Sequence, residues 1–180
     1  MKVIFLDIDG VLNSVDSMVA FHEWKPKGTR VMIEDKLDEV SVGLLRRLCN
    51  ETGAKIVVSS TWRMGRTGDD FIEIFTRHDW PEFPYLDQTP IGHQINPIGE
   101  RTRGHEIQHW LDNNGNPEYV ILDDDSDMLE SQMNNFVHCS GISGFRGKHY
   151  CKAMRILGHP EDLLESQVNW KRHTEKSEYD

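Results

Sequence analysis

Residues 2–11 read Lys2-Val-Ile-Phe-Leu-Asp7-Ile-Asp9-Gly10-Val11, and this run predicts a buried strand that ends in two carboxylates. Its apolar part has no polar interruption, which is typical of a strand covered on both faces. Parallel strands present functional side chains at their carboxyl ends, so Asp7 and Asp9 are expected at one edge of a sheet. Gly10 would allow a tight turn there. Two carboxylates so placed can bind a divalent cation, or share phosphoryl transfer as nucleophile and acid–base.

The rest of the chain alternates strand and helix patterns, which predicts a parallel α/β sheet with helices on both faces. Strands are expected at residues 3–6, 55–58, 119–122 and 136–139. Helices are expected at residues 69–77, 102–113 and 148–157, and between a capping Ser41 and Gly53. We therefore predict a three-layer α/β/α sandwich with a mainly parallel, Rossmann-like sheet.

The expected organisation is one domain over residues 1–157, followed by a polar tail at 158–180. Two stretches, 13–32 and 79–99, are predicted to be irregular insertions, and the second is rich in proline. Neither insertion is long enough for a large cap domain.

Composition narrows the functional classes. The net charge of −10 argues against broad nucleic-acid binding, which needs a basic face, although a local basic strip remains compatible with it. No apolar stretch is long enough to span a membrane, and a signal-peptide pattern is absent, so a cytoplasmic location is expected. Three widely spaced cysteines fit a reducing compartment. The sequence gives no indication of the oligomeric state.

Polar residues follow three of the apolar runs. They are Asp7 and Asp9 after the first, Ser59 after the second, and Asp123 with Asp124 after the third. Neighbouring strand ends of an open parallel sheet meet at one crevice. The three groups together therefore predict a single polar site.

This order of motifs resembles the haloacid dehalogenase (HAD) superfamily of phosphohydrolases. Its first motif matches Asp7-Ile-Asp9-Gly10, its second Ser59, its third a basic residue at Arg103, and its fourth Asp123-Asp124. The resemblance covers about residues 1–157. It implies a HAD-type sheet and a Mg²⁺-dependent hydrolase that forms an aspartyl-phosphate.

The resemblance also assigns roles to the acidic residues. Asp7 would be the nucleophile, and Asp9 would protonate the leaving oxygen and then activate water. Mg²⁺ would be held by the Asp7 carboxylate, the Asp9 backbone carbonyl and Asp124. Asp123 is the second choice as direct ligand, with Asp127 in an outer position.

The phosphoryl group would contact Ser59, with Ser60 as the less favoured alternative, and the positive charge of Arg103. Arg101 is a rival for the basic position, where the superfamily usually has lysine. Arg63 follows the second motif closely enough to reach a substrate, although a surface salt bridge is equally compatible with its position. Trp62 is expected to pack rather than to stack on a base.

A narrower resemblance joins the chain to RNA-repair phosphatases and polynucleotide 3′-phosphatase domains. It rests on Phe5-Leu-Asp-Ile-Asp-Gly-Val-Leu-Asn13, Val58-Ser-Ser-Thr-Trp-Arg63 and Val120-Ile-Leu-Asp-Asp124. It implies a phosphorylated substrate, a 3′-phosphorylated nucleic-acid end or a nucleotide, acted on in nucleic-acid repair. The predicted substrate-binding residues are Gly10, Ser60, Arg63, Lys25 and Lys27.

Three other functions remain open at this point. The same motifs fit a general small-molecule phosphatase, or a non-catalytic binding module that keeps the fold. His105-Glu-Ile-Gln-His109 matches the zinc-protease pattern H-E-x-x-H, although no third ligand can be nominated.

Overall fold

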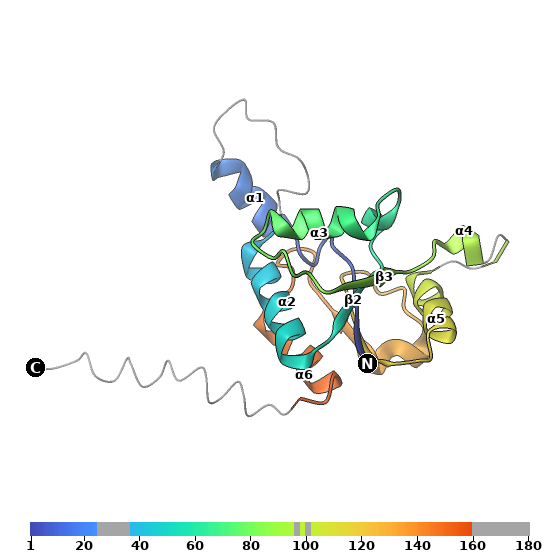
Figure 1. The fold of residues 1–180 in the computed structure, drawn as a ribbon. Helices are drawn as coiled ribbons and strands as arrows, with labels where there is room; N and C mark the ends of the chain where they lie inside the picture. The colour runs from blue at the N-terminus through green and yellow to red at the C-terminus, as the bar shows by residue number, and fades with distance from the viewer. Residues whose placement is uncertain (25–36, 96–97, 100–101, 160–180) are drawn as a thin grey trace, which may run out of the picture.

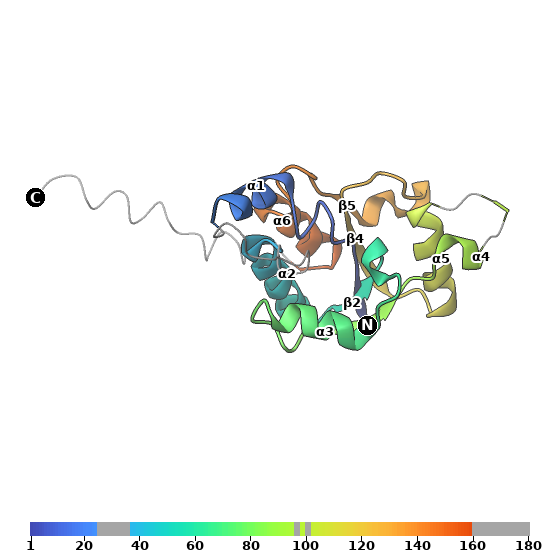
Figure 2. The same ribbon diagram turned by 90° about the horizontal axis from the view of Figure 1, so that it is seen from above.

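A single sheet forms the centre of the protein, with helices on both of its faces (Figures 1 and 2). The structure is a computed structural model that describes residues 1–24, 37–95, 98–99 and 102–159. The sheet consists of β1 (Lys2–Leu6), β2 (Lys55–Val58), β3 (Tyr85–Gln88), β4 (Glu118–Asp123) and β5 (Phe136–His138). All neighbouring strands are parallel, in the order β3-β2-β1-β4-β5. The predicted α/β/α fold is confirmed, and the described residues contain no large cap domain.

The helices divide between the two faces of the sheet (Figure 2). They are α1 (Val15–Trp24), α2 (Glu39–Thr52), α3 (Gly68–Thr76), α4 (Gly92–Ile95), α5 (Arg103–Asn113) and α6 (Gly147–Ile156). Helices α2, α3 and α6 pack on one face, and α5 packs on the other. The chain moves outward from β1 to β3 and then crosses to β4 on the opposite side of β1. That reversal opens a crevice at the carboxyl ends of the central strands.

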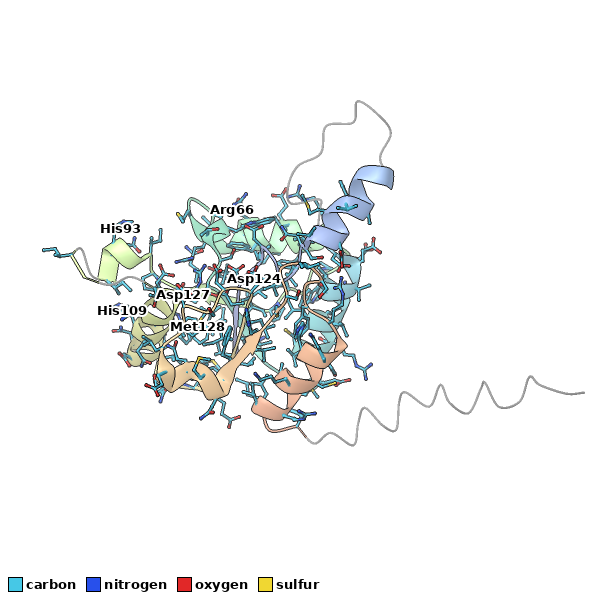
Figure 3. The ribbon with its side chains drawn as sticks, turned by 180° about the vertical axis from the view of Figure 1, so that it is seen from behind. Arg66, His93, His109, Asp124, Asp127 and Met128 are labelled. Atoms are coloured by element: carbon cyan, nitrogen blue, oxygen red, sulfur yellow. The ribbon has the colours of Figure 1, made fainter. Side chains whose placement is uncertain are left out.

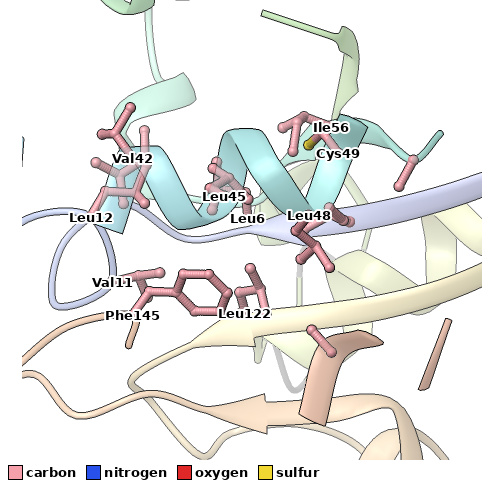
Figure 4. Packing of buried hydrophobic residues seen from close by; sticks show 14 of the residues in the cluster. Leu6, Val11, Leu12, Val42, Leu45, Leu48, Cys49, Ile56, Leu122 and Phe145 are labelled. Carbon is pink, nitrogen blue, oxygen red and sulfur yellow. The ribbon is translucent and has the colours of Figure 1, made fainter. Parts of the chain in front are cut away.

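The protein has a hydrophobic core on each face of the sheet, because successive side chains of β1 point to opposite faces. Ile4 and Leu6 face the layer of α2, α3 and α6, whereas Val3 and Phe5 face α5. Figure 4 shows Leu45 of α2 close to Leu6. Both residues have no exposed surface. Truncation of such a leucine to alanine typically costs about 2–5 kcal/mol.

The strands predicted at 3–6, 55–58, 119–122 and 136–139 are confirmed as β1, β2, β4 and β5. The helix predicted from Ser41 instead has Asp38 as its N-cap, and the Asp38 side chain accepts a hydrogen bond from the Val40 backbone N–H. Ser41 lies one turn further along and is buried, with its hydroxyl donating to the Phe145 carbonyl at 3.1 Å. Ser41 does not cap the helix because it is already the third residue of α2.

Two stretches predicted to be irregular contain regular structure. Helix α1 occupies part of 13–32, and its Val15 and Val19 are 57% and 61% exposed, so no buried apolar stripe marks it in the sequence. Strand β3 lies within the proline-rich stretch 79–99. It is an edge strand, where flanking prolines do not interrupt a central ladder.

Candidate active site

The end of β1 carries Asp7 into the crevice between β1 and its neighbours. The Asp7 backbone N–H donates to the Leu122 carbonyl of β4 at 2.9 Å, and the Ser59 N–H donates to the Leu6 carbonyl at 3.0 Å. These two bonds continue the sheet ladders past the ends of β1 and β2. The predicted meeting of three strand ends is therefore present.

A cluster of carboxylates forms the floor of this site. One oxygen from each of Asp7, Asp123 and Asp124 lies within 4.8 Å of the other two. In the described part of the chain, no other set of three acidic, histidine or cysteine side chains comes together in this way. Asp7 and Asp123 are buried, and Asp124 is half-buried.

Burial and mutual repulsion raise the pKa values of these three carboxylates above the ordinary value for aspartate. Burial, assisted by the charge of Asp123, raises the pKa of Asp7 to about 8, although Arg103 opposes the change. Burial raises the pKa of Asp123 to about 6, again against Arg103. Burial and the charge of Asp125 also raise the pKa of Asp124. A divalent cation bound to these hard oxygens would relieve the repulsion, so the donor set fits Mg²⁺.

Gly10 makes the close approach of Asp124 possible. Its backbone φ is +72°, a left-handed conformation that favours glycine. A Cβ at this position would lie 2.1 Å from Asp124 Oδ2, and one at Gly141 would lie 2.7 Å from the same oxygen. Side chains are therefore excluded from both sides of the Asp124 carboxylate. The sequence predicts a substrate contact for Gly10, and the geometry adds this spacing role.

Arg103, the first residue of α5, supplies the positive charge next to the acidic cluster. Its Nη2 lies 3.4 Å from Asp7 Oδ1, and its Nε lies 3.3 Å from Asp123 Oδ2. Its Nη1 also pairs with Glu106 Oε2 at 3.1 Å. The predicted convergence of Arg103 and Asp7 is thus found. The rival Arg101 lies outside the described residues, as do Lys25 and Lys27.

Comparison with known proteins gives the chain a family. The sequence model for the HAD domain in Swiss Army Knife RNA repair proteins matches residues 3–150. The chain belongs to this family. Searches of curated proteins and of solved structures returned no match. Membership in a HAD domain family of RNA repair proteins supports a phosphatase-type role.

Arg63 is buried, and its guanidinium is held by groups of the protein itself. Its side chain is 3% exposed, and its Nη2 pairs with Glu106 Oε2 at 2.6 Å. The remaining donors bond to backbone carbonyls, namely those of Ser59, Ser60, Thr89 and Pro90. The prediction that Arg63 binds substrate is therefore wrong. Arg63 clamps the segments that follow β2 and β3.

Glu106 explains the H-E-x-x-H match in the HAD domain. Its Oε2 accepts from both Arg63 and Arg103, and its Oε1 accepts from the Gly92 backbone N–H at 2.8 Å. Figure 3 shows His109 on α5, well away from Asp124. Both carboxylate oxygens of Glu106 are occupied by these contacts, and no described histidine joins the acidic cluster. The geometry therefore does not support zinc proteolysis.

The two serines after β2 differ in their surroundings. Ser59 Oγ is buried and has no hydrogen-bond partner among the described residues. Ser60 Oγ accepts from the Trp62 backbone N–H and caps a short 3₁₀ helix, Thr61–Arg63. The unpaired hydroxyl of Ser59 is the one available to a phosphoryl oxygen. Ser60 is 1% exposed and acts as a cap.

Asp127, predicted as an outer-shell residue, contacts the start of α5. Its Oδ2 accepts from the Arg103 backbone N–H at 2.9 Å, so it binds the first turn of α5. Figure 3 shows it on the α5 side of Asp124. A carboxylate is favoured at this end of a helix. Asp127 therefore holds the Arg103 end of α5 in place.

Asp9 lies beside the acidic cluster but faces different partners. Its Oδ1 accepts from Asn13 Nδ2 at 2.8 Å, and its Oδ2 accepts from Trp62 Nε1 at 2.9 Å. Asn13 Oδ1 in turn accepts from the Gly10 N–H at 3.0 Å. Sequence reasoning does not identify Asn13 or Trp62 as site residues. The short spacing from Asp9 to Asn13 is a usable sequence signal, whereas Trp62 offers none.

A cleft of about 550 Å³ opens beside Asp9 and Asp124. Helix α1 bounds it through Val15, Met18 and Val19. Its lining residues are Asp9, Gly10, Asn13, Ser14, Val15, Met18, Val19, Asp124 and Gly141. No helix among the described residues is long and apolar enough to cross a membrane.

Proposed function

We propose that this HAD domain is a Mg²⁺-dependent phosphomonoesterase that works through an aspartyl-phosphate. The observation that carries the proposal is the convergence of Asp7, Asp123 and Asp124 beside the guanidinium of Arg103. A nucleophilic carboxylate, a cation site and a positive charge for the transferred group are the parts that phosphoryl transfer needs. Family membership supports the same reaction class.

The metal would be held by the carboxylates of Asp7, Asp124 and Asp123, with the Asp9 backbone carbonyl proposed as a further ligand. When bound, Mg²⁺ would favour the ionised form of Asp7 and neutralise part of the charge of the phosphoryl group. The raised pKa values of Asp7 and Asp123 support this assignment, since burial and the neighbouring carboxylates disfavour their charged forms and a bound cation would stabilise them.

The chain's own groups would carry the reaction in two steps. In the first, an Asp7 oxygen attacks phosphorus, the bond from phosphorus to the leaving oxygen breaks, and Asp9 gives that oxygen a proton. In the second, Asp9 takes a proton from water, the water oxygen attacks phosphorus, and the bond to Asp7 breaks to release phosphate. Ser59 Oγ and Arg103 would bind the non-bridging oxygens throughout.

The proposed substrate is a 3′-phosphorylated nucleic-acid end or a nucleotide. The open cleft beside Asp9 suits a chain end, because no large cap among the described residues encloses it. The RNA-repair family adds support. We also propose residues 1–157 as the catalytic domain, 158–180 as a polar tail, and a cytoplasmic location, which the three free cysteines support.

The test measures phosphate release from a 3′-phosphorylated oligonucleotide and from p-nitrophenyl phosphate, with Mg²⁺ and with a chelator. Asp7→Asn is the inactive variant, and Asp112→Asn, on the exposed end of α5, is its matched control. We expect release from the oligonucleotide to exceed release from the aryl ester, and to vanish in Asp7→Asn and without Mg²⁺.

The other outcomes separate the alternatives. Release from the aryl ester alone would keep the mechanism and refute the nucleic-acid substrate. No release from either compound by folded protein would refute the phosphatase and favour a non-catalytic binding module. Equal loss in Asp7→Asn and Asp112→Asn would refute the assignment of the nucleophile.

A further inference from the structure

Both oxygens of the Asp9 carboxylate are held by protein donors. Asn13, in the same loop, binds Oδ1, and Trp62, 53 residues away, binds Oδ2. Rotation of the Asp9 carboxylate about its Cβ–Cγ bond would break both hydrogen bonds. Each oxygen still has a second acceptor position, so a proton can be carried while both donors remain.

Trp62 is itself fixed by its surroundings. Its side chain belongs to the core that includes α2 and α3, and the residue is 5% exposed. Its backbone N–H donates to Ser60 Oγ, and the guanidinium carbon of Arg66 lies 5.3 Å from the centre of its ring. The Arg66 Nη1 also donates to the Trp62 carbonyl at 3.0 Å. The Trp62 side chain is therefore held rigidly, and its indole N–H donates to Asp9 from a fixed position.

We propose that Trp62 is a positioning residue for the acid–base step, in which its Nε1–H fixes the orientation of the Asp9 carboxyl group toward the cleft. The inference rests on the proposed function, because it assigns Asp9 the proton of the leaving oxygen. Any aromatic ring of similar size would satisfy the packing of the core at position 62. The packing would not require the donor atom of that ring to lie 2.9 Å from this carboxylate.

If the Asp9 carboxyl group is wrongly oriented, the loss in cleavage rate depends on how much the leaving oxygen needs a proton. A ribose oxygen is a poor leaving group and needs a proton, whereas p-nitrophenolate leaves readily without one. Loss of the Trp62 N–H should therefore slow cleavage of a nucleoside phosphate more than cleavage of the aryl ester. A general loss of folded protein would lower both rates by the same factor.

The experiment compares kcat/KM for 3′-phosphorylated oligonucleotide and for p-nitrophenyl phosphate in Trp62→Phe, which keeps a ring and removes the N–H. The constant kcat/KM reports the steps up to release of the leaving group, so the later hydrolysis does not obscure the difference. Trp110→Phe is the matched control, because Trp110 is also buried and donates its Nε1–H to a carboxylate, Asp87 Oδ2, at 2.7 Å.

We expect Trp62→Phe to lower kcat/KM for the oligonucleotide at least about tenfold and for the aryl ester no more than about threefold. Trp110→Phe should leave the ratio of the two constants at the wild-type value. Should Trp62→Phe lose its fold by circular dichroism, Trp62→Met, which fills the same core position and also lacks the N–H, is measured in the same way, and the same fall in the ratio of the two constants is expected.

Equal losses on both substrates, or no loss on either, would make Trp62 a packing residue and overturn the proposal. Failure of both Trp62 variants to fold would have the same consequence. Absence of activity in the wild-type protein would instead refute the proposed function itself, so the two failures are distinguishable.

Discussion

Replacement of Arg63 by methionine is the sharpest test of how this site is built. The sequence allows Arg63 either a substrate contact or a surface salt bridge, whereas the structure buries it between the segments after β2 and β3. A substrate contact would affect KM, and a buried clamp would affect stability. The substitution keeps most of the apolar stem and removes the guanidinium.

The expected loss of stability follows from the contacts of Arg63. Removing one partner of a buried ion pair typically costs about 3–5 kcal/mol. Glu106 would keep two donors, the Gly92 N–H and Arg103, so we expect the lower end of this range. For a chain of this length each kcal/mol corresponds to about 2–4 °C, which predicts a fall in Tm of roughly 6–12 °C.

The assay is thermal unfolding followed by circular dichroism, with activity measured well below the new Tm. Arg47→Met is the control, because Arg47 pairs with Glu51 at 2.8 Å on the surface with a 41% exposed side chain. An exposed pair of this kind contributes about 0.3–0.5 kcal/mol. We expect Arg63→Met to keep a near wild-type KM where it is folded. An unchanged Tm together with a severalfold higher KM would refute the clamp and restore the substrate contact.

Three further outcomes are expected. Because the pKa of Asp7 is about 8 in the folded protein, against 3.8 for an ordinary aspartate, the metal-free protein should lose stability as pH rises from about 4 to about 8. Asp7→Asn should flatten that slope in denaturant titrations and raise the metal-free Tm at the upper end by at least ~2–4 °C; an unchanged slope would exclude Asp7 as the source of this pH dependence. Gly10→Ala should displace Asp124 and abolish the Mg²⁺-induced rise in Tm, and a wild-type rise would refute the spacing role of Gly10. Ser59→Ala should lower kcat/KM by about 10²–10³ with no loss of stability, because its hydroxyl has no partner to lose among the described residues. A lower Tm with full activity would exclude the contact between Ser59 and the phosphoryl group.

Local patterns predicted most of the sheet. Four of the five strands are apolar runs whose boundaries are visible in the sequence, and Asp7 and Ser59 could be placed because each directly follows such a run. The fifth strand, β3, is a partly exposed edge strand between prolines, and its pattern does not differ from that of a loop. Helix α1 escapes prediction for a related reason, because its apolar residues stay exposed beside the cleft.

The sequence by itself determined four of the five described strands, the position of the carboxylates at their ends and the family. Each of these follows from residues that are neighbours in the chain. Only the tertiary structure decided that Arg63 is buried against Glu106, because its partners come from the segments after β2 and β3 and from α5, which lie far apart in the chain. It also decided the contact of Trp62 with Asp9. Such contacts depend on how helices and loops cross the sheet, which brings residues far apart in the chain within hydrogen-bond distance.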